Sequence, residues 1–147
     1  MKTTFDEIKN LKHQSIVLVD DYSVCDGLHA NNTDARALSV GLSQWDSKEI
    51  SAKVLRKPGN VWSRQSEELP LHRCFDLCNL IILAFLKSKG IDFGGELEFN
   101  TIQIKTIDIK QIEEFYEQNK HYLLPKMTIL KDLLETWIAL NSNSGHI

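Results

Sequence analysis

The chain has few cysteines and prolines and no long hydrophobic run. Three cysteines and three prolines occur in 147 residues, and so few cysteines argue against the disulfide framework of a small secreted domain. The longest apolar stretch, residues 77–86, is interrupted by Asn79 and covers about half of the roughly 20 residues that span a bilayer. The N-terminal residues MKTTFDEIKNLK lack the apolar segment of a signal peptide. These absences predict a soluble, cytoplasmic protein without membrane contact.

An excess of charge and the familiar catalytic motifs are also missing. The net charge is −3, from 17 basic and 20 acidic residues, so the chain lacks the basic field on which non-specific nucleic-acid binding depends. No GxSxG, Walker, GxGxxG or HExxH pattern is present, which excludes the enzyme classes that these motifs define. We expect no general nucleic-acid binding and no cofactor. Catalysis stays an open question, with a non-catalytic role preferred.

What is present is typical of one globular domain. Hydrophobic residues make up 42% and charged residues 25% of the chain, which are ordinary values for such a domain. No internal repeat or low-complexity tract interrupts the pattern. We expect a single domain over residues 1–140 and a polar tail over residues 141–147.

Alternating apolar residues predict an antiparallel sheet. Strands are expected at residues 14–20, 37–43, 50–57 and 61–65, and a further one at residues 101–105. In the second strand, leucine and valine alternate with alanine, serine and glycine, which gives one apolar face and one small-residue face. In the third, Ala52 and Val54 face one way and Lys53 the other.

Helical spacing and capping residues predict the other elements. A short helix capped by Thr4 opens the chain, and a long helix begins at Ser66 or Pro70 and ends near Lys89. Two C-terminal helices are expected, one after Asp108 and one opened by Pro125. The predicted fold is α+β: an antiparallel sheet of four or five strands packed against one long central helix and two C-terminal helices.

A polar stripe on the long helix offers the clearest catalytic hypothesis. Its members are separated by four, four and three positions: Glu68, His72, Asp76 and Asn79. Side chains at this spacing lie on one face of a helix. Asp76 could orient His72 as a general base, with Arg73 steadying developing charge, as in a hydrolase or nuclease. A solvated helix face explains the same pattern and is the preferred interpretation.

The start of the same helix suggests a binding site for an anion. A helix N-terminus offers free N–H groups, and a nearby arginine can hold phosphate or carboxylate. The ligand-binding candidates are Trp62, as a stacking platform, with Arg64, Ser66 and Arg73. Two competing acids, Glu67 and Glu68, already occupy the favourable field, so local pairing is the alternative.

Metal sites receive weaker support. Acids and amides in the loop of residues 21–34 suit magnesium or calcium but match no ligand template. Zinc would need Cys25, His29, Cys74 and Cys78 to meet, yet the last two lie on an apolar helix. We predict no metal. The remaining histidines, His13, His121 and His146, are expected on the surface.

The segments ALSVGLSQWDSKEISAKVLRK and WSRQSEELPLHR resemble small bacterial proteins of an uncharacterised family. The resemblance covers residues 31–86 and implies a bacterial or bacteriophage source. It carries no activity or ligand.

The preferred function is a non-catalytic binding module that recognises a small anionic or nucleotide-like ligand or a protein partner. The alternatives are the His72–Asp76 hydrolase or nuclease and an acidic immunity or antitoxin-type protein. Exposed sheet edges would also suit a homodimer.

Overall fold

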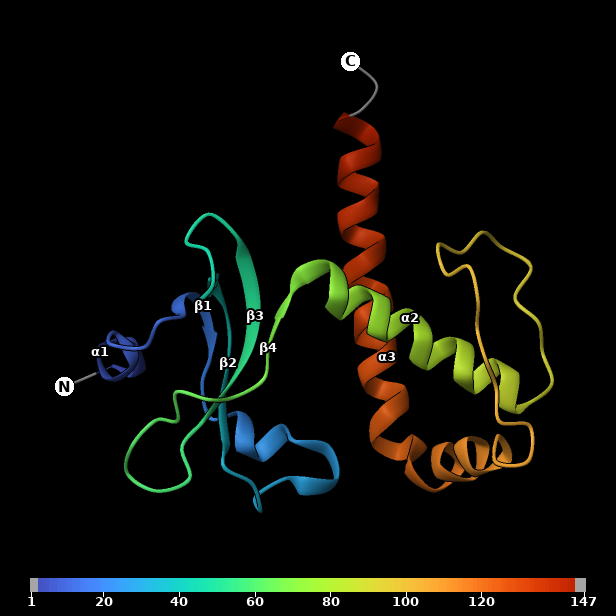
Figure 1. Cartoon of the computed structure of the whole chain (residues 1–147), viewed down its shortest axis with the longest axis horizontal. Coiled ribbons are helices and arrows are strands. Elements are labelled where there is room, and N and C mark those ends of the chain that lie inside the picture. Colours follow the sequence, from blue (N-terminus) through green and yellow to red (C-terminus); the bar gives the residue numbers. More distant parts are fainter. Residues whose placement is uncertain (1–2, 145–147) are drawn as a thin grey trace. The chain divides into compact units, whose positions relative to one another are not determined.

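The computed structural model describes residues 3–144. Its internal contacts divide the chain into two compact units, Met1–Leu80 and Ile81–Ile147, so each is described by itself (Figure 1). Whether both belong to the one predicted domain stays a prediction. Residues 141–144 of the predicted tail are helical, and residues 145–147 lie outside the described part.

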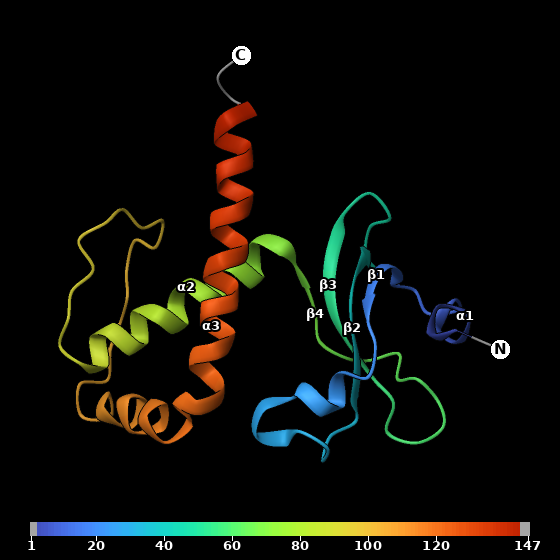
Figure 2. The ribbon, with the colours of Figure 1, turned by 180° about the vertical axis from the view of Figure 1, so that it is seen from behind.

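The first unit is built on a four-stranded antiparallel sheet in the order β1-β2-β3-β4 (Figure 2). The strands are β1 (Gln14–Val19), β2 (Ala35–Leu42), β3 (Ile50–Arg56) and β4 (Glu68–Pro70). Each runs beside its neighbour in sequence, as short antiparallel connections favour. This sheet confirms the α+β prediction and its antiparallel strands.

Two predicted strands are wrong. Residues 61–65 form a loop, because Trp62 turns into the core and the Ser63 hydroxyl bonds both the carbonyl and the N–H of Gln65. The fourth strand lies further on, at Glu68–Pro70. Residues 101–105 are extended but belong to no strand, since an alternating segment needs a partner to complete its hydrogen bonds.

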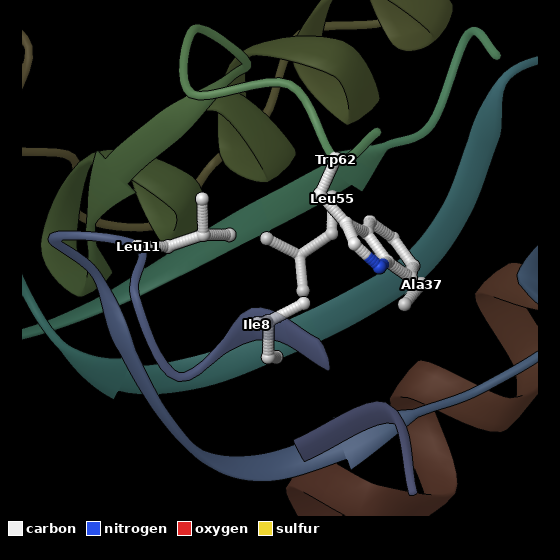
Figure 3. Packing of buried hydrophobic residues seen from close by; sticks show 5 residues of the cluster. All are labelled: Ile8, Leu11, Ala37, Leu55 and Trp62. Carbon is white, nitrogen blue, oxygen red and sulfur yellow. The ribbon is translucent and has the colours of Figure 1, made fainter. Parts of the chain in front are cut away.

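The hydrophobic core of this unit is small and lies against one face of the sheet. The short helix α1 (Thr4–Ile8) is capped by Thr3, one residue before the predicted cap, and Asp6 completes a capping box. The core side chains come from α1, the segment after it, β2, β3 and the following loop: Ile8, Leu11, Ala37, Leu55 and Trp62. Figure 3 shows Ile8 and Leu11 on the N-terminal segment, gathered with Leu55 and Trp62. The N-terminal segment therefore covers this face.

Helix α2 (Leu71–Ser88) begins directly after β4. Of the two predicted starts, the structure agrees with Pro70, because this residue ends the strand and its fixed φ suits the turn into a helix. Glu68 consequently lies on a strand and is not part of the helical stripe. Gly90, with φ of 74°, follows the helix as the expected stop.

The second unit contains one long helix, α3 (Lys110–Ser144), so the prediction of two C-terminal helices is wrong. Pro125 lies inside α3, where it removes a single backbone hydrogen bond and leaves the other turns intact. The ribbon of α3 bends within its first half (Figure 1). The large apolar side chains of Ile129, Leu133 and Trp137 on α3 are exposed. Across residues 3–144, no helix combines the length and apolar character needed to cross a membrane.

Candidate functional site

The face of the sheet that packs on the N-terminal segment carries polar as well as apolar side chains. Ser39 of β2 lies opposite Lys53 of β3, and Lys53 lies opposite Glu68 of β4. Ser39, Ser51 and Lys53 are at most 4% exposed. Buried polar groups need hydrogen-bond partners, so the partners of these side chains define the site.

Gly41 lets β1 approach β2 closely enough to complete the network. A Cβ atom at this position would lie 2.0 Å from the carbonyl oxygen of Gln14 and 2.8 Å from the Cα of Ser15. No other residue type avoids this overlap without moving the backbone. The close approach places Ser15 within reach of Ser39.

A chain of hydrogen bonds runs across this buried face. The Oγ atoms of Ser15 and Ser39 are 2.5 Å apart, and Ser39 Oγ lies 2.8 Å from His13 Nε2. On the other side of the imidazole, His13 Nδ1 lies 3.1 Å from Ser51 Oγ. Ser51 donates to Glu68 Oε2 at 2.9 Å. We call these five residues the buried relay.

The direction of the relay follows from counting hydrogens. An ionised carboxylate only accepts, and each serine hydroxyl donates a single hydrogen. Because Ser51 donates to Glu68, His13 Nδ1 must donate to Ser51, and the neutral imidazole then accepts at Nε2 from Ser39. Ser15 in turn donates to Ser39. The neutral ring therefore carries its proton on Nδ1, an assignment made from the network.

Lys53 and the backbone of Gln44 hold the carboxylate at the end of the relay. Lys53 Nζ lies 3.5 Å from Glu68 Oε1, and the N–H of Gln44 donates to Oε2 at 3.0 Å. Among the described residues, neither Oε1 nor the Lys53 ammonium makes a hydrogen bond. The pair is thus an ion pair between two side chains that are each at most 2% exposed.

The electrostatics of the relay keep His13 neutral and Glu68 ionised. Burial lowers the pKa of His13 below its ordinary value of 6.5 and outweighs the opposing effect of nearby Glu68. Burial also raises the pKa of Glu68, but the hydrogen bonds from Gln44 and Ser51 and the positive charge of Lys53 outweigh burial and hold this pKa below its ordinary value of 4.5. At neutral pH the relay therefore holds one carboxylate and a neutral imidazole.

The prediction that His13 lies on the surface is wrong, since this residue is 1% exposed. Its neighbour Lys12 is exposed. The lysine beside it in the sequence therefore gave no indication of where the histidine points.

A basic pocket opens beside the relay. This cavity of about 310 Å³ is lined by three cationic side chains and three carboxamide residues: Lys12, Lys53, Arg64, Asn10, Gln44 and Gln65. Lys12 and Arg64 are exposed, and within residues 3–144 their side chains have no hydrogen bond or ion pair. None of the described residues that line the cavity is a carboxylate. We refer to these six residues as the basic pocket.

A second cavity, of about 350 Å³, shares Asn10 and Arg64 with the basic pocket. Its acid, Glu7, accepts from Trp62 Nε1 at 3.1 Å and lies 3.6 Å from Lys57 Nζ. These contacts offset the charge of Glu7 within its own cavity. Arg64 lines both cavities, and its side chain has no ion pair within residues 3–144.

The predicted ligand-binding residues are only partly brought together. Arg64 lines both cavities. Trp62 lines the second one, but it is 9% exposed, belongs to the core and has Lys57 Nζ 5.2 Å from its ring centroid. The Ser66 hydroxyl is buried and lacks a hydrogen-bond partner among the described residues. Its role, and stacking on Trp62, stay predictions.

The predicted catalytic pair lies on α2. His72 and Arg73 are exposed, and Asp76 is half-buried. In the described part of the chain, none of the three side chains has a hydrogen bond or ion pair. The structure therefore supplies no contact by which Asp76 orients His72, and the catalytic role stays a prediction.

The described residues form no cluster of side chains that would support the metal hypotheses. Residues 3–144 contain no group of three or more His, Cys, Asp or Glu side chains placed to hold a metal ion. Cys25 is exposed, and Cys74 and Cys78 are half-buried.

The fold and the site together define a small α+β protein with a basic pocket beside a buried polar network. Residues 5–92 match a family of unknown function, DUF6530. This match covers more than half of the chain, so the chain belongs to that family, which confirms the resemblance to an uncharacterised family. The matched region contains the whole sheet, α2 and every residue of the basic pocket. No curated protein and no solved structure matches the chain.

Most of the pocket and relay was missed from the sequence. The available signal was Lys53, a charge in the middle of an apolar strand, which shares a face with Ser51 by strand alternation. Its partners lie far along the chain: Ser51 and His13 are 38 positions apart. Only the strand register brings them together.

Proposed function

We propose that this protein is a non-catalytic binding module for a small anionic ligand, which it holds in the basic pocket. The observation that carries the proposal is a cavity lined by three cations and three carboxamide residues, in which Lys12 and Arg64 lack partners among the described residues. Arginine and lysine side chains beside amide donors suit phosphate or carboxylate groups.

The state of Lys53 supports this proposal. Its side chain is 2% exposed and makes no hydrogen bond among the described residues, although it pairs with Glu68 at 3.5 Å. Lys53 also lines the basic pocket. An anion in the pocket would accept hydrogen bonds from it.

The size of the cavity favours a compact ligand. At about 310 Å³ it lies near the lower end of the roughly 300–1,000 Å³ typical of small-molecule sites. A larger anion, such as a nucleotide, would also need the neighbouring cavity that shares Arg64. We therefore take the phosphate-sized group as the part recognised in the basic pocket.

Inorganic phosphate is the first probe. We expect calorimetric titration to detect binding by the full chain and to show it weakened at least tenfold in Lys12→Ala and Arg64→Ala, since each removes a charge-assisted contact worth about 1.5–3 kcal/mol. Lys48→Ala is the matched control, because this exposed lysine of the same unit lies outside the basic pocket.

Equal affinities in all four proteins would refute the pocket assignment. Loss of binding in Arg73→Ala, with Arg64→Ala unaffected, would instead favour the helix-start site predicted from the sequence.

The cellular setting completes the proposal. We place the module in the cytoplasm of a bacterium, supported by the low cysteine content of three in 147 residues and by the free thiols of Cys74 and Cys78, which suit a reducing compartment. The hydrolase, immunity-protein and homodimer alternatives stay predictions from the sequence.

A further inference from the structure

We propose that the basic pocket binds its anion together with one proton, and that His13 in the buried relay accepts this proton. The inference rests on the proposed function, because it concerns the regulation of the same pocket.

A single carboxylate connects the pocket to the histidine. Lys53 lines the pocket and lies 3.5 Å from Glu68 Oε1. Gln44 also lines the pocket, and its N–H donates to Glu68 Oε2 at 3.0 Å. The same Oε2 atom lies 3.5 Å from His13 Nδ1 and accepts from Ser51, which contacts the ring. Two pocket residues therefore touch the group that faces His13.

Two charged groups act on His13, and an anion in the pocket would offset the charge of only one of them. Glu68 from β4 and Lys53 from β3 are the charged groups that act on the ring, and they oppose each other. β1 and β2 present only the hydroxyls of Ser15 and Ser39. An anion bound to Lys53 would offset the positive charge that now opposes protonation of His13. The attraction of Glu68 for the charged imidazole would then prevail.

The relay can accept a proton without losing a contact. When Nε2 of His13 takes a proton from solvent, the ring becomes a donor at both nitrogens. Ser39 then accepts from Nε2 and turns its own hydrogen toward Ser15. Ser15 is half-buried, so its hydroxyl can donate to water at the outer end of the relay. One proton is gained from solvent, and every pair of heavy atoms stays bonded.

Thermodynamic linkage fixes the direction of the effect. Anything that binds more tightly when His13 is charged must raise the pKa of His13 by the same free energy. Burial lowers that pKa in the free protein, so the ring is neutral at neutral pH. Anion affinity should therefore increase as the pH falls through the ordinary range of histidine.

Sulfate is the best probe, because it stays a dianion across the pH range in which histidine titrates. We expect its affinity for the full chain to increase at least about fivefold between about pH 8 and about pH 5.5. A fivefold change is at the lower end of the typical coupling between two binding sites. Calorimetry near the lower pH in two buffers of different ionisation enthalpy should show net uptake of a fraction of a proton per sulfate, which grows with the strength of the coupling.

Two variants test the identity of the proton acceptor. His13→Gln should still bind sulfate near pH 8 but should lose both the proton uptake and the pH dependence. His121→Gln is the control, since this exposed histidine of the second unit contacts Tyr122 and lies outside the relay. It should behave as the wild-type protein does.

Because His13→Gln replaces a buried side chain, an NMR titration of the wild-type imidazole gives an answer that does not depend on the variant. The pKa of His13 should rise by about 0.7 or more when whichever of sulfate and phosphate binds is added, which is the same free energy as the fivefold change in affinity. An unchanged pKa, with pH-independent binding and no proton uptake, overturns the inference and leaves the anion site intact. Absence of binding by both anions overturns the anion site as well.

Discussion

The two faces of the four-stranded sheet differ in chemistry and in burial. One face carries alanine, serine, glycine and lysine, and Ala37, Ser51 and Lys53 on it are at most 4% exposed. The opposite face carries mainly valine and leucine, yet Val17 is 62% and Val19 50% exposed. Side-chain polarity alone therefore does not determine which face is buried. Small side chains let the N-terminal segment lie close to the sheet, and Ile8 and Leu11 on that segment provide the apolar contacts.

The polar face can be buried because its groups satisfy one another. The relay pairs three hydroxyls, an imidazole and a carboxylate, and such a network stabilises only when its members are bonded. The apolar face needs no such network, and a groove of about 380 Å³ runs over it between strands and the start of α2. Substitutions on the polar face should accordingly have larger effects than matched substitutions on the apolar face.

Glu68 and Glu67 give the sharpest version of the comparison, because these neighbours point to opposite faces. The Glu68 side chain is 1% exposed and faces Lys53, while that of Glu67 is 55% exposed and pairs with Arg56. Glu68→Ala leaves a buried ammonium unpaired and should lower the free energy of unfolding by about 3–5 kcal/mol. Glu67→Ala should lower it by about 1 kcal/mol or less.

Urea denaturation of the two variants measures both changes. Equal losses of stability would mean that Glu68 is no more important than a surface acid, contrary to the burial of the relay.

A pair of leucines tests the apolar contacts of the same two faces. Leu55 is fully buried in the core beneath the N-terminal segment, and Leu38, on the opposite face, is half-buried. Leu55→Ala should lower the free energy of unfolding by about 2–5 kcal/mol, since it removes packed methyl groups and leaves a cavity. Leu38→Ala should have a clearly smaller effect in the same denaturation experiment. The reverse order would show that the apolar face holds the true core.

Gly41 tests whether close approach of β1 and β2 is required. The new methyl group of Gly41→Ala would overlap the carbonyl oxygen of Gln14, and both strands would have to separate. We expect a loss of about 1–3 kcal/mol, as for other overpacked sites. Gly59→Ala is the control, because nothing lies within 4 Å of a Cβ atom there. A neutral Gly41→Ala would indicate that the strands separate readily.

The sequence allowed the sheet to be predicted but did not reveal which face is buried. Alternation in β2 places Leu38 and Val40 on one side and Ala37 and Ser39 on the other, and both arrangements satisfy the pattern. The choice depends on Ile8 and Leu11, which reach the sheet only through the tertiary fold.

Long-range contacts limited the prediction of the site in the same way. Arg64 was identified because it lies just before a predicted helix start, where a nearby arginine can hold an anion. His13 was missed because its partners come from three different strands, and no local spacing records that register. Pro125 was read as a helix start by local rules, whereas the surrounding turns of α3 tolerate it.

The pH dependence of stability should also distinguish the polar face from the apolar face. We expect this effect to be smaller than those of the substitutions above. Burial lowers the pKa of His13 below 6.5, so the unfolded chain binds a proton more readily than the folded one. The contribution of His13 to the free energy of unfolding is complete above about pH 6.5. It is lost as the pH falls toward the lower pKa of the folded state, with a slope of at most about 1.4 kcal/mol per pH unit for one proton. Glu68, whose pKa lies below 4.5, should add a second loss of the same sign in more acidic solution.

Urea denaturation of wild-type protein and His13→Gln across this range measures the difference, and only the wild-type protein should show the first loss. Sulfate should reduce that loss if the anion and the proton bind together. A parallel decline in both proteins would assign the effect to groups outside the relay.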